Sequence, residues 1–384
     1  MVSSSQKKWV WQHSAWPRFT WDTEALIRAI GRVRQAQGEM GATAKLLDPQ
    51  LGLTAQQETL TTEALMTSAI EGENLDPAGL RSSIARRLGL PTAGLPTPSR
   101  GVEGLVEMLI DATQRYEQPL TLKRLHGWQA ALFPTGRSGL HEIKVGALRG
   151  AQPMRIVSGP VDRERVHYEA PPHERLGSEM RSFVEWFNRP PANLDGLVRA
   201  GLAHAWFELI HPYEDGNGRV GRALLDMALA QDERRSIRFY SMSARLMMKR
   251  DDYYCALERA STGSLDLTEW LSWFLEQVEA AMASSEWLVN AVLRKARFWV
   301  AYAREEFNER QLKALNRMLD AGPEGFVGGM TNKKYQHLTG SSAATGQRDL
   351  ADLVEKGCLI LTGSGRSVHY ELAPANSGHQ QTST

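Results

Sequence analysis

The sequence predicts a mainly α-helical protein with two or three domains. Apolar residues recur at three-, four- and seven-residue steps along most of the 384 residues, which is the spacing of amphipathic helices. Alternating, strand-like runs are confined to one stretch in the middle of the chain and one near its end. With 42% hydrophobic and 23% charged residues, the chain can bury sizeable cores and is not disordered as a whole. The domain count follows from a typical domain length of roughly 150 residues.

Residues 1–101 are expected to form an N-terminal helical region that ends in a linker. Four of the 11 tryptophans lie in its first 21 residues, so this arm is expected to pack onto another part of the chain. Thr54 and Gln57 have the spacing of a capping box, which predicts a helix over about 54–72. The linker is predicted at 89–101, where Pro, Gly, Ser and Thr dominate.

The rest of the chain divides into a central domain, a connecting helix, a small C-terminal unit and a tail. Residues 102–288 carry several helical patterns, including one over 243–262, and a predicted β-hairpin around Gly159-Pro160. A connecting helix is expected at 289–307. Residues 308–372 read as three helices followed by a hairpin with a GSGR turn, and the polar residues 373–384 are expected to be disordered.

Charge and cysteine content exclude several classes of protein. The net charge is +1, from 45 Lys+Arg and 44 Asp+Glu, so the chain does not coat a polyanion and any nucleic-acid contact must be local. Two cysteines exclude a disulfide scaffold or a cysteine-rich zinc module and fit a reducing cytosol. No apolar signal segment begins the chain, and no stretch approaches 18 uninterrupted apolar residues. We therefore expect a cytoplasmic protein without a membrane span.

The segment His211–Arg222, HPYEDGNGRVGR, has the composition of a phosphate-binding loop. Pro212 ends the preceding helix, and glycines on both sides of Asn217 let the backbone amides form a concavity at the start of the next helix. Free amides and the helix dipole favour an anion there. Each of these features alone is common in helix ends, turns and solvated helix faces. Their joint occurrence in twelve residues favours a binding site.

Charged side chains in the same segment supply the chemistry. Arg219 and Arg222 are three residues apart and share a helix face, so both could bind one polyphosphate. Asp215 offers the hard oxygen ligand that Mg²⁺ prefers, together with phosphate oxygens. His211 is a candidate general base near neutral pH. The residues alone thus indicate a metal-assisted phosphate site with a base beside it.

This segment resembles the Fic family motif His-Pro-Phe-x-(Asp/Glu)-Gly-Asn-Gly-Arg-x-x-Arg, with Tyr213 in place of the usual phenylalanine. The resemblance extends over roughly 103–288 and implies a helical Fic core with a β-hairpin flap. It also implies transfer of AMP from ATP to a Ser, Thr or Tyr hydroxyl of a target protein, with self-modification. Glycine at 218, where the related Doc-like toxins carry lysine, favours adenylylation over phosphorylation.

The resemblance also implies a role for each site residue. His211 would deprotonate the target hydroxyl, Asp215 would hold Mg²⁺, and Tyr254 would line the adenine pocket. The α-phosphate would lie against the Gly216, Asn217 and Gly218 amides and the Asn217 side chain, and the β- and γ-phosphates would bind Arg219 and Arg222. The flap would bind the target backbone by strand addition. Its second strand consists of Arg165, Val166, His167, Tyr168 and Glu169.

The segment Thr67–Gly72, TSAIEG, resembles the Fic inhibitory motif (Ser/Thr)-x-x-x-Glu-(Gly/Asn). Without the adenylylation motif elsewhere in the chain, Glu71 would be read as a solvated glutamate before a glycine that ends a helix. With that motif present, the resemblance implies that the Glu71 carboxylate pairs with Arg222 and occupies the arginine that the γ-phosphate needs. The resemblance therefore implies an autoinhibited adenylyltransferase whose inhibitory helix lies in the same chain.

The C-terminal unit resembles a winged helix, with the GSGR turn as its wing. Its eight basic and seven acidic residues leave a net charge of about +1, which favours protein docking over DNA binding. Two alternatives to AMP transfer remain open. The same site could remove AMP, with Glu71 positioning a water molecule, or the chain could be a DNA-binding regulator that acts through the winged helix. The oligomeric state also stays open, with a homodimer as one option.

Overall fold

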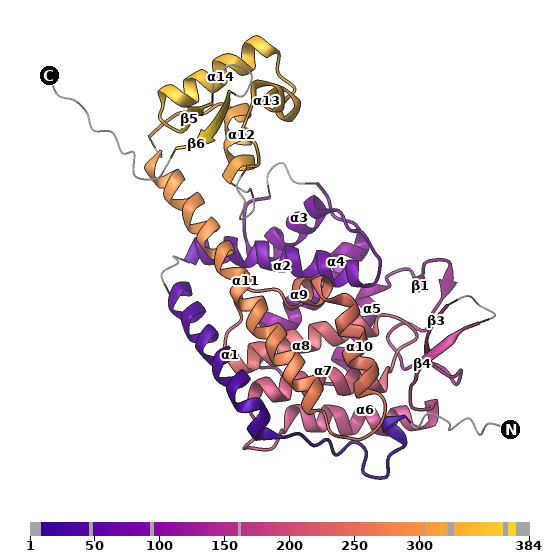
Figure 1. Cartoon of the computed structure of the whole chain (residues 1–384). Helices are drawn as coiled ribbons and strands as arrows, with labels where there is room; N and C mark the ends of the chain where they lie inside the picture. Colours follow the sequence, from indigo (N-terminus) through magenta and orange to yellow (C-terminus); the bar gives the residue numbers. More distant parts are fainter. Residues whose placement is uncertain are drawn as a thin grey trace. The chain divides into compact units, whose positions relative to one another are not determined.

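The computed structural model describes residues 9–45, 49–92, 96–159, 163–302, 304–319, 321, 326–363 and 368–373, without the side chains of 285–293 and 296 (Figure 1). The expectation of a mainly helical protein is confirmed. The chain divides into two compact units. The first contains residues 1–46 and 52–285, and the second contains residues 47–51 and 286–384.

The first unit is built from helices with two small hairpins. In chain order, these helices are η1 (Val10–Gln12), α1 (Thr23–Ala44), α2 (Pro49–Ile70), α3 (Pro77–Leu88), α4 (Arg100–Gln114), α5 (Leu122–Leu132), α6 (His173–Asn188), α7 (Gly196–Ile210), α8 (Asn217–Glu233), α9 (Met242–Met248), α10 (Arg250–Ala260) and α11 (Thr268–Ala301), which runs on into the second unit. The antiparallel hairpins are β1–β2 (Arg137–Ser138, His141–Glu142) and β3–β4 (Arg155–Ser158, Arg165–Glu169).

Three details differ from the sequence analysis. The helix expected to begin at Thr54 begins at Pro49, because proline at a first helical position is itself a start signal. The single helical pattern at 243–262 is divided into α9 and α10 because Lys249 leaves helical geometry, with φ −115° and ψ 34°. The short hairpin β1–β2 was not expected, and its four residues are too few to show an alternating pattern.

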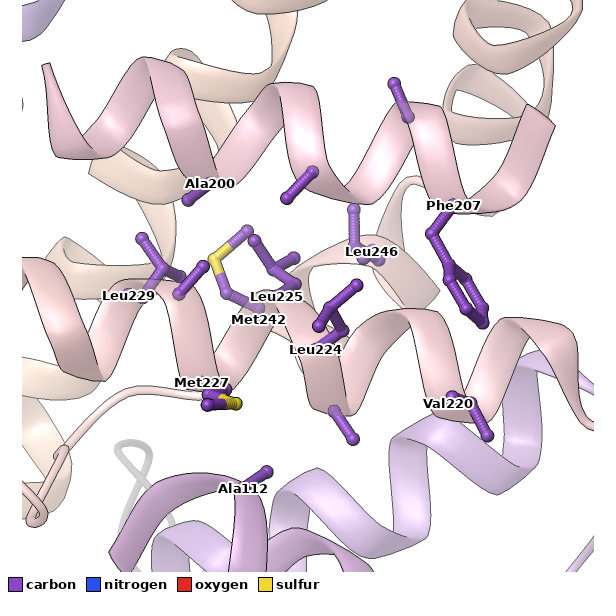
Figure 2. Close-up of a cluster of buried hydrophobic side chains, with 14 of the residues drawn as sticks. Ala112, Ala200, Phe207, Val220, Leu224, Leu225, Met227, Leu229, Met242 and Leu246 are labelled. Atoms are coloured by element: carbon purple, nitrogen blue, oxygen red, sulfur yellow. The ribbon is translucent and has the colours of Figure 1, made fainter. Parts of the chain in front are cut away.

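Helices α7 and α8 form the centre of the first unit. In α7 almost every side chain from Leu197 to Ile210 is buried, which explains why it is apolar on all sides. Figure 2 shows the two helices side by side, with Phe207 of α7 above the α8 side chains Val220 and Leu224. Methionines 227 and 242 complete this packed layer. The loop 211–216 joins α7 to α8, so a rigid core holds it at both ends.

The tryptophan-rich arm packs against the β3–β4 hairpin and α6. The Trp9 ring lies 5.5 Å from the Tyr168 ring in an edge-to-face contact. Trp11 donates from Nε1 to the carbonyl oxygen of Glu169 at 2.7 Å, and Trp16 donates from Nε1 to Glu179 Oε2 at 2.8 Å. The arm therefore supports the base of the hairpin.

The second unit has its own core. Its elements are α12 (Glu309–Leu319), α13 (Asn332–Thr339), α14 (Ala343–Glu355), β5 (Leu359–Thr362) and β6 (His369–Leu372), with β5 and β6 antiparallel. This is the order of three helices and a hairpin that the sequence predicts, while its identity as a winged helix stays a prediction. Residues 364–366 of the GSGR turn and 374–384 of the tail lie outside the described residues. Among the described residues, no helix is both long and apolar enough to cross a membrane.

Candidate active site

His211 lies at the C-terminal end of α7 in a left-handed conformation, with φ 50° and ψ 60°. Its backbone N–H still donates to Phe207 O at 3.0 Å, and Pro212 prevents another helical turn. The side chain turns back toward α7, where Nδ1 donates to Glu208 O at 3.3 Å. This contact leaves Nε2 as the nitrogen that can take a proton from a substrate. Burial lowers the pKa of His211 to about 4, so the imidazole is neutral at physiological pH.

The loop after His211 is held by two side chains that lie far from each other in the sequence. Asn217 accepts from Tyr213 N through Oδ1 and donates to Tyr213 O through Nδ2, both at 2.9 Å. Arg149, which is buried, donates from Nε to His211 O at 2.9 Å, and its own backbone N–H donates to Pro212 O at 2.9 Å. The Asn217 side chain thus ties the start of α8 to the backbone of Tyr213, and Arg149 holds the carbonyl groups of His211 and Pro212.

Tyr213 keeps its hydroxyl paired although the side chain is fully buried. The hydroxyl forms a hydrogen bond with His126 Nδ1 at 3.2 Å, and the two rings meet edge to face. A tyrosine is therefore accommodated where the motif usually has phenylalanine.

The N-terminal end of α8 presents its amides toward the inside of the loop. Gly216 precedes the helix with φ 86°, and a Cβ there would lie 2.9 Å from the Phe133 ring, so only glycine fits without strain. Asp215 accepts from Gly216 N through Oδ1 at 2.5 Å, and its Oδ2 accepts from Ser138 of β1. The Asp215 carboxylate is therefore positioned at the opening of the helix end.

Both motif arginines are buried and both are paired with acids. Arg222 donates from Nε to Thr67 Oγ1 at 2.7 Å and from Nη2 to Glu71 Oε1 at 2.6 Å. Arg219 donates from Nη1 to Glu73 Oε2 at 2.8 Å. The side chains of Glu71 and Glu73 are 33% and 46% exposed, whereas the two arginines are exposed by 2% and 6%. Both acids lie just after the C-terminal end of α2, so this one segment pairs with both arginines of α8.

The Glu71 carboxylate also lies against the first turn of α8. A Cβ on Gly218 would be 2.3 Å from Glu71 Oε1 and 2.9 Å from Arg222 Nη1. Glycine at 218 therefore makes room for an oxygen anion at the amino end of the helix. That position combines free amides, a favourable dipole and a guanidinium, which are the features of an anion site.

Helix α10 carries Tyr254 and, one turn further on, contacts the flap. Tyr254 is 41% exposed, and its hydroxyl donates to Ile70 O, at the end of α2, at 3.4 Å. Toward the other end of the helix, Glu258 binds Arg165 Nη2 at 3.2 Å and His167 Nδ1 at 3.0 Å. Tyr168 is buried, with its hydroxyl donating to Leu209 O at 2.5 Å. Of the predicted flap strand, Arg165 is the exposed residue, and Val166, His167 and Glu169 are half-buried.

The structure thus brings the predicted residues 211–222, Glu71 and Tyr254 to one place and adds residues that the sequence analysis missed. These are Arg149, Gln129, Glu73 and Glu208. Gln129 is buried and donates to Asp215 O at 3.3 Å. Glu73 follows Glu71 by two residues and could have been noticed as a second acid after the helix. Nothing local in the sequence marks the other three.

Comparisons with known proteins agree with this geometry. Residues 119–229 match the Fic/DOC family, and residues 9–90 match a domain of unknown function, DUF4172. A probable protein adenylyltransferase of Aquifex aeolicus is 32% identical over 105 residues, which cover 27% of this chain and 30% of the relative. A protein adenylyltransferase of Caenorhabditis elegans is 24% identical over 211 residues, covering 54% of this chain and 38% of the relative. The chain therefore spans about a third of the length of these curated relatives.

A solved structure extends the likeness to nearly the whole chain. The crystal structure of a Fic family protein from Desulfovibrio desulfuricans matches with a TM-score of 0.53 and 19% identity, covering 92% of this chain and 97% of the other. At that identity the match concerns the fold. The motif and the loop between α7 and α8 both lie within residues 119–229, so this segment of the chain is a Fic domain.

Proposed function

We propose that this protein is an autoinhibited protein adenylyltransferase, which transfers AMP from ATP to a hydroxyl side chain of a target protein. The adenylyltransferases among its relatives support the reaction at the level of the family. The observation that carries the proposal is the Arg222–Glu71 pair of 2.6 Å at the amino end of α8. It supports the proposal because a carboxylate of the same chain holds the arginine that the γ-phosphate would need.

In the reaction, His211 Nε2 accepts the proton of the target hydroxyl. The hydroxyl oxygen then bonds to the α-phosphorus of ATP, the bond from that phosphorus to the β-phosphate oxygen breaks, and pyrophosphate leaves. The neutral state of His211 suits this role, because a base must be unprotonated to accept the proton. The amides of Gly216, Asn217 and Gly218 would stabilise the charge on the α-phosphate.

The residues present also fit Mg²⁺. Asp215 supplies a carboxylate at the opening of the loop, fixed by Gly216 N and Ser138. Within the described residues, no group of three or more His, Cys, Asp or Glu side chains could hold a metal ion. An ion bound to Asp215 would thus take most of its ligands from phosphate oxygens and water, as Mg²⁺ commonly does, and it would neutralise phosphate charge.

Inhibition follows from competition for the same groups. Arg222 would bind the γ-phosphate and Arg219 the β-phosphate, but both guanidinium groups are now paired with acids. Tyr254, whose hydroxyl contacts Ile70 O, would line the adenine pocket. Release of the α2 end would free all three side chains for the nucleotide.

The target protein would dock on the β3–β4 hairpin. All four residues of β3 are exposed, including Ile156 at 43% and Val157 at 41%, so backbone and apolar side chains are both accessible to an added strand. Self-modification would occur when a hydroxyl of the chain itself reaches the site. The relatives are named for AMP transfer, which favours transfer over AMP removal or DNA-directed regulation.

The test is intact-mass spectrometry of the chain after incubation with ATP and Mg²⁺. We expect additions of the mass of AMP for a Glu71→Ala variant and none for a Glu71→Ala/His211→Ala variant. A Glu71→Ala variant that binds ATP but adds no AMP to itself or to any protein of a cell extract would refute the proposal.

A further inference from the structure

Glu208 is a buried acid beside His211 to which the Fic motif gives no role. It lies in the last turn of α7, three residues before His211, with its Oε2 at 4.0 Å from His211 Nδ1. The side chains of Glu208 and His211 are only 11% and 18% exposed. Oε1 of Glu208 is buried and has no hydrogen-bond partner among the described residues. A buried carboxyl oxygen without a partner is costly and calls for a reason.

Helix α8 is shaped to accept this carboxyl. A Cβ on Gly221 would lie 2.3 Å from Glu208 Oε1, so a larger residue at 221 would displace the acid. The close approach of α7 and α8 at this point is fixed by His204, whose Nδ1 donates to Gly221 O at 3.1 Å. The carboxyl is therefore held in a defined place between the two central helices.

Charged and titratable groups from α8, α10 and the end of α2 interact with Glu208. Arg222 of α8 favours its ionised form, while Glu71, just after α2, disfavours it. His211, three residues further along the chain, also lies beside Glu208. Tyr253 of α10 is close enough to interact electrostatically with the Glu208 carboxyl. Burial raises the pKa of Glu208 to about 7. The charge of this group thus changes near neutral pH.

His211 needs such a neighbour. A general base works best when its pKa is near the working pH, but burial lowers the pKa of His211 to about 4. The proton taken from the target hydroxyl would then sit on a poorly solvated imidazolium. An anion on the Nδ1 side of the ring would offset that cost, as the third residue of a Ser-His-Asp triad does. Contacts of this kind are often long in the free enzyme and shorten during the reaction.

We propose that Glu208 is a positioning residue for His211: its carboxylate orients the Nδ1 side of the ring and stabilises the imidazolium that forms when Nε2 takes the target proton. No atom of Glu208 exchanges with the substrate, and the proton stays on His211 until it is released. The inference rests on the proposed AMP transfer. It also assigns a second effect to Glu71, whose removal leaves Glu208 easier to ionise.

The experiment uses the full chain with Glu71→Ala as the active parent and measures kcat, the KM for ATP and the pH dependence of AMP transfer from pH 5 to 9. We expect the parent to lose activity at the acid end of this range as Glu208 takes up a proton, with the loss beginning below pH 7 because the parent lacks the Glu71 charge that raises the Glu208 pKa. Glu208→Gln should lower kcat at pH 7.5 by about tenfold or more and keep the KM for ATP within twofold. It should also remove the loss of activity at low pH, which is the acid limb of the pH profile. Glu208→Asp, which keeps the charge, should keep the limb and recover part of kcat.

Glu63→Gln is the matched control, because Glu63 of α2 is also buried with one unpaired carboxyl oxygen but has its contacts at Ser241 and Ser243. It should leave the pH profile of the parent unchanged. A Glu208→Gln variant with the kcat and acid limb of the parent would overturn the inference, as would an equal shift in Glu63→Gln. If Glu208→Gln does not fold, a parent profile that is flat from pH 5 to 8 overturns it as well. No transfer by the parent at any pH would instead mean that the proposed function itself is wrong.

Discussion

Replacing Glu71 by alanine should activate the protein, although the change removes a charged group from the proposed active site. Glu71 makes one of the hydrogen bonds that hold Arg222, while Thr67 accepts two others, at Oγ1 and at its carbonyl oxygen. The substitution therefore removes one of the two acceptors of Nη2, while Nε and Nη2 both stay bound to Thr67. It also empties the position beside Gly218 at the amino end of α8.

The size of the effect follows from these contacts. A hydrogen bond between charged groups contributes about 1.5–3 kcal/mol, and the 33% exposure of the Glu71 side chain places this pair at the low end. The favourable interaction of a carboxylate with the helix dipole adds about 0.3–1 kcal/mol. ATP has to displace the Glu71 carboxylate from both Arg222 and the helix end. Removal of Glu71 should therefore tighten productive ATP binding or raise transfer by about tenfold or more, since about 1.4 kcal/mol is a factor of ten.

The assay is transfer of labelled AMP at several ATP concentrations, with Glu58→Ala as the matched control. Glu58 is also on α2, but it pairs with Arg81 on the surface, at 3.2 Å, so its removal should not activate. The Glu71→Ala/Arg222→Ala double variant should also stay inactive, because it removes the phosphate ligand together with the inhibitory contact. Activity of Glu71→Ala equal to or below wild type would show that residues 67–72 are only the end of a helix.

The remaining predictions concern single side chains, with transfer measured in the Glu71→Ala parent. His211→Ala should lower AMP transfer by about 10²- to 10⁴-fold without weakening ATP binding in calorimetry, because the histidine acts on the nucleophile; near-parental transfer would refute its role as the base. Asp215→Ala should abolish the dependence of transfer on Mg²⁺ along with most of the activity, and an unchanged Mg²⁺ titration would show that the metal binds elsewhere. In the wild-type chain, Glu73→Ala should lower the KM for ATP by only about twofold, because its pair with Arg219 is half-exposed and such pairs contribute little. Tyr213→Phe should reduce the free energy of unfolding by about 1 kcal/mol in a urea titration, through the hydrogen bond to His126, and leave transfer intact.

The parts of the site that could be predicted from the sequence are those held by local geometry. Pro212 ends α7, Gly216 has a left-handed conformation, and α8 begins immediately afterwards. The backbone of residues 211–222 is therefore determined by the residue types within the segment. Glu71 was also predicted, but only through its resemblance to a known inhibitory motif. Its contact with Arg222 spans 151 residues, and no periodicity or spacing could have indicated it.

What could not be predicted depends on contacts between distant segments. Arg149 lies outside any motif, 62 residues before the loop that it holds. In the sequence, Glu208 is one polar residue in an apolar helix, and only the space that Gly221 of α8 leaves for its carboxyl distinguishes it. The start of α2 was misplaced because a capping box and a first-turn proline both fit the sequence, and local rules do not rank them.

In the proposed mechanism, Arg222 lies where the inhibitory and catalytic contacts meet, so one segment would control both binding and chemistry. It interacts with Glu71 directly and with Glu208 through the electrostatic field, and Glu208 in turn faces His211. When the Arg222–Glu71 pair breaks, the guanidinium is freed for phosphate, and a negative charge that disfavours ionisation of Glu208 is removed at the same time. ATP that then binds brings new negative charge to Arg222. The buried carboxyl therefore responds to whichever anion occupies the amino end of α8. A pH profile of transfer that differs between low and saturating ATP is the direct consequence of this arrangement, since the occupant of that site changes between the two conditions.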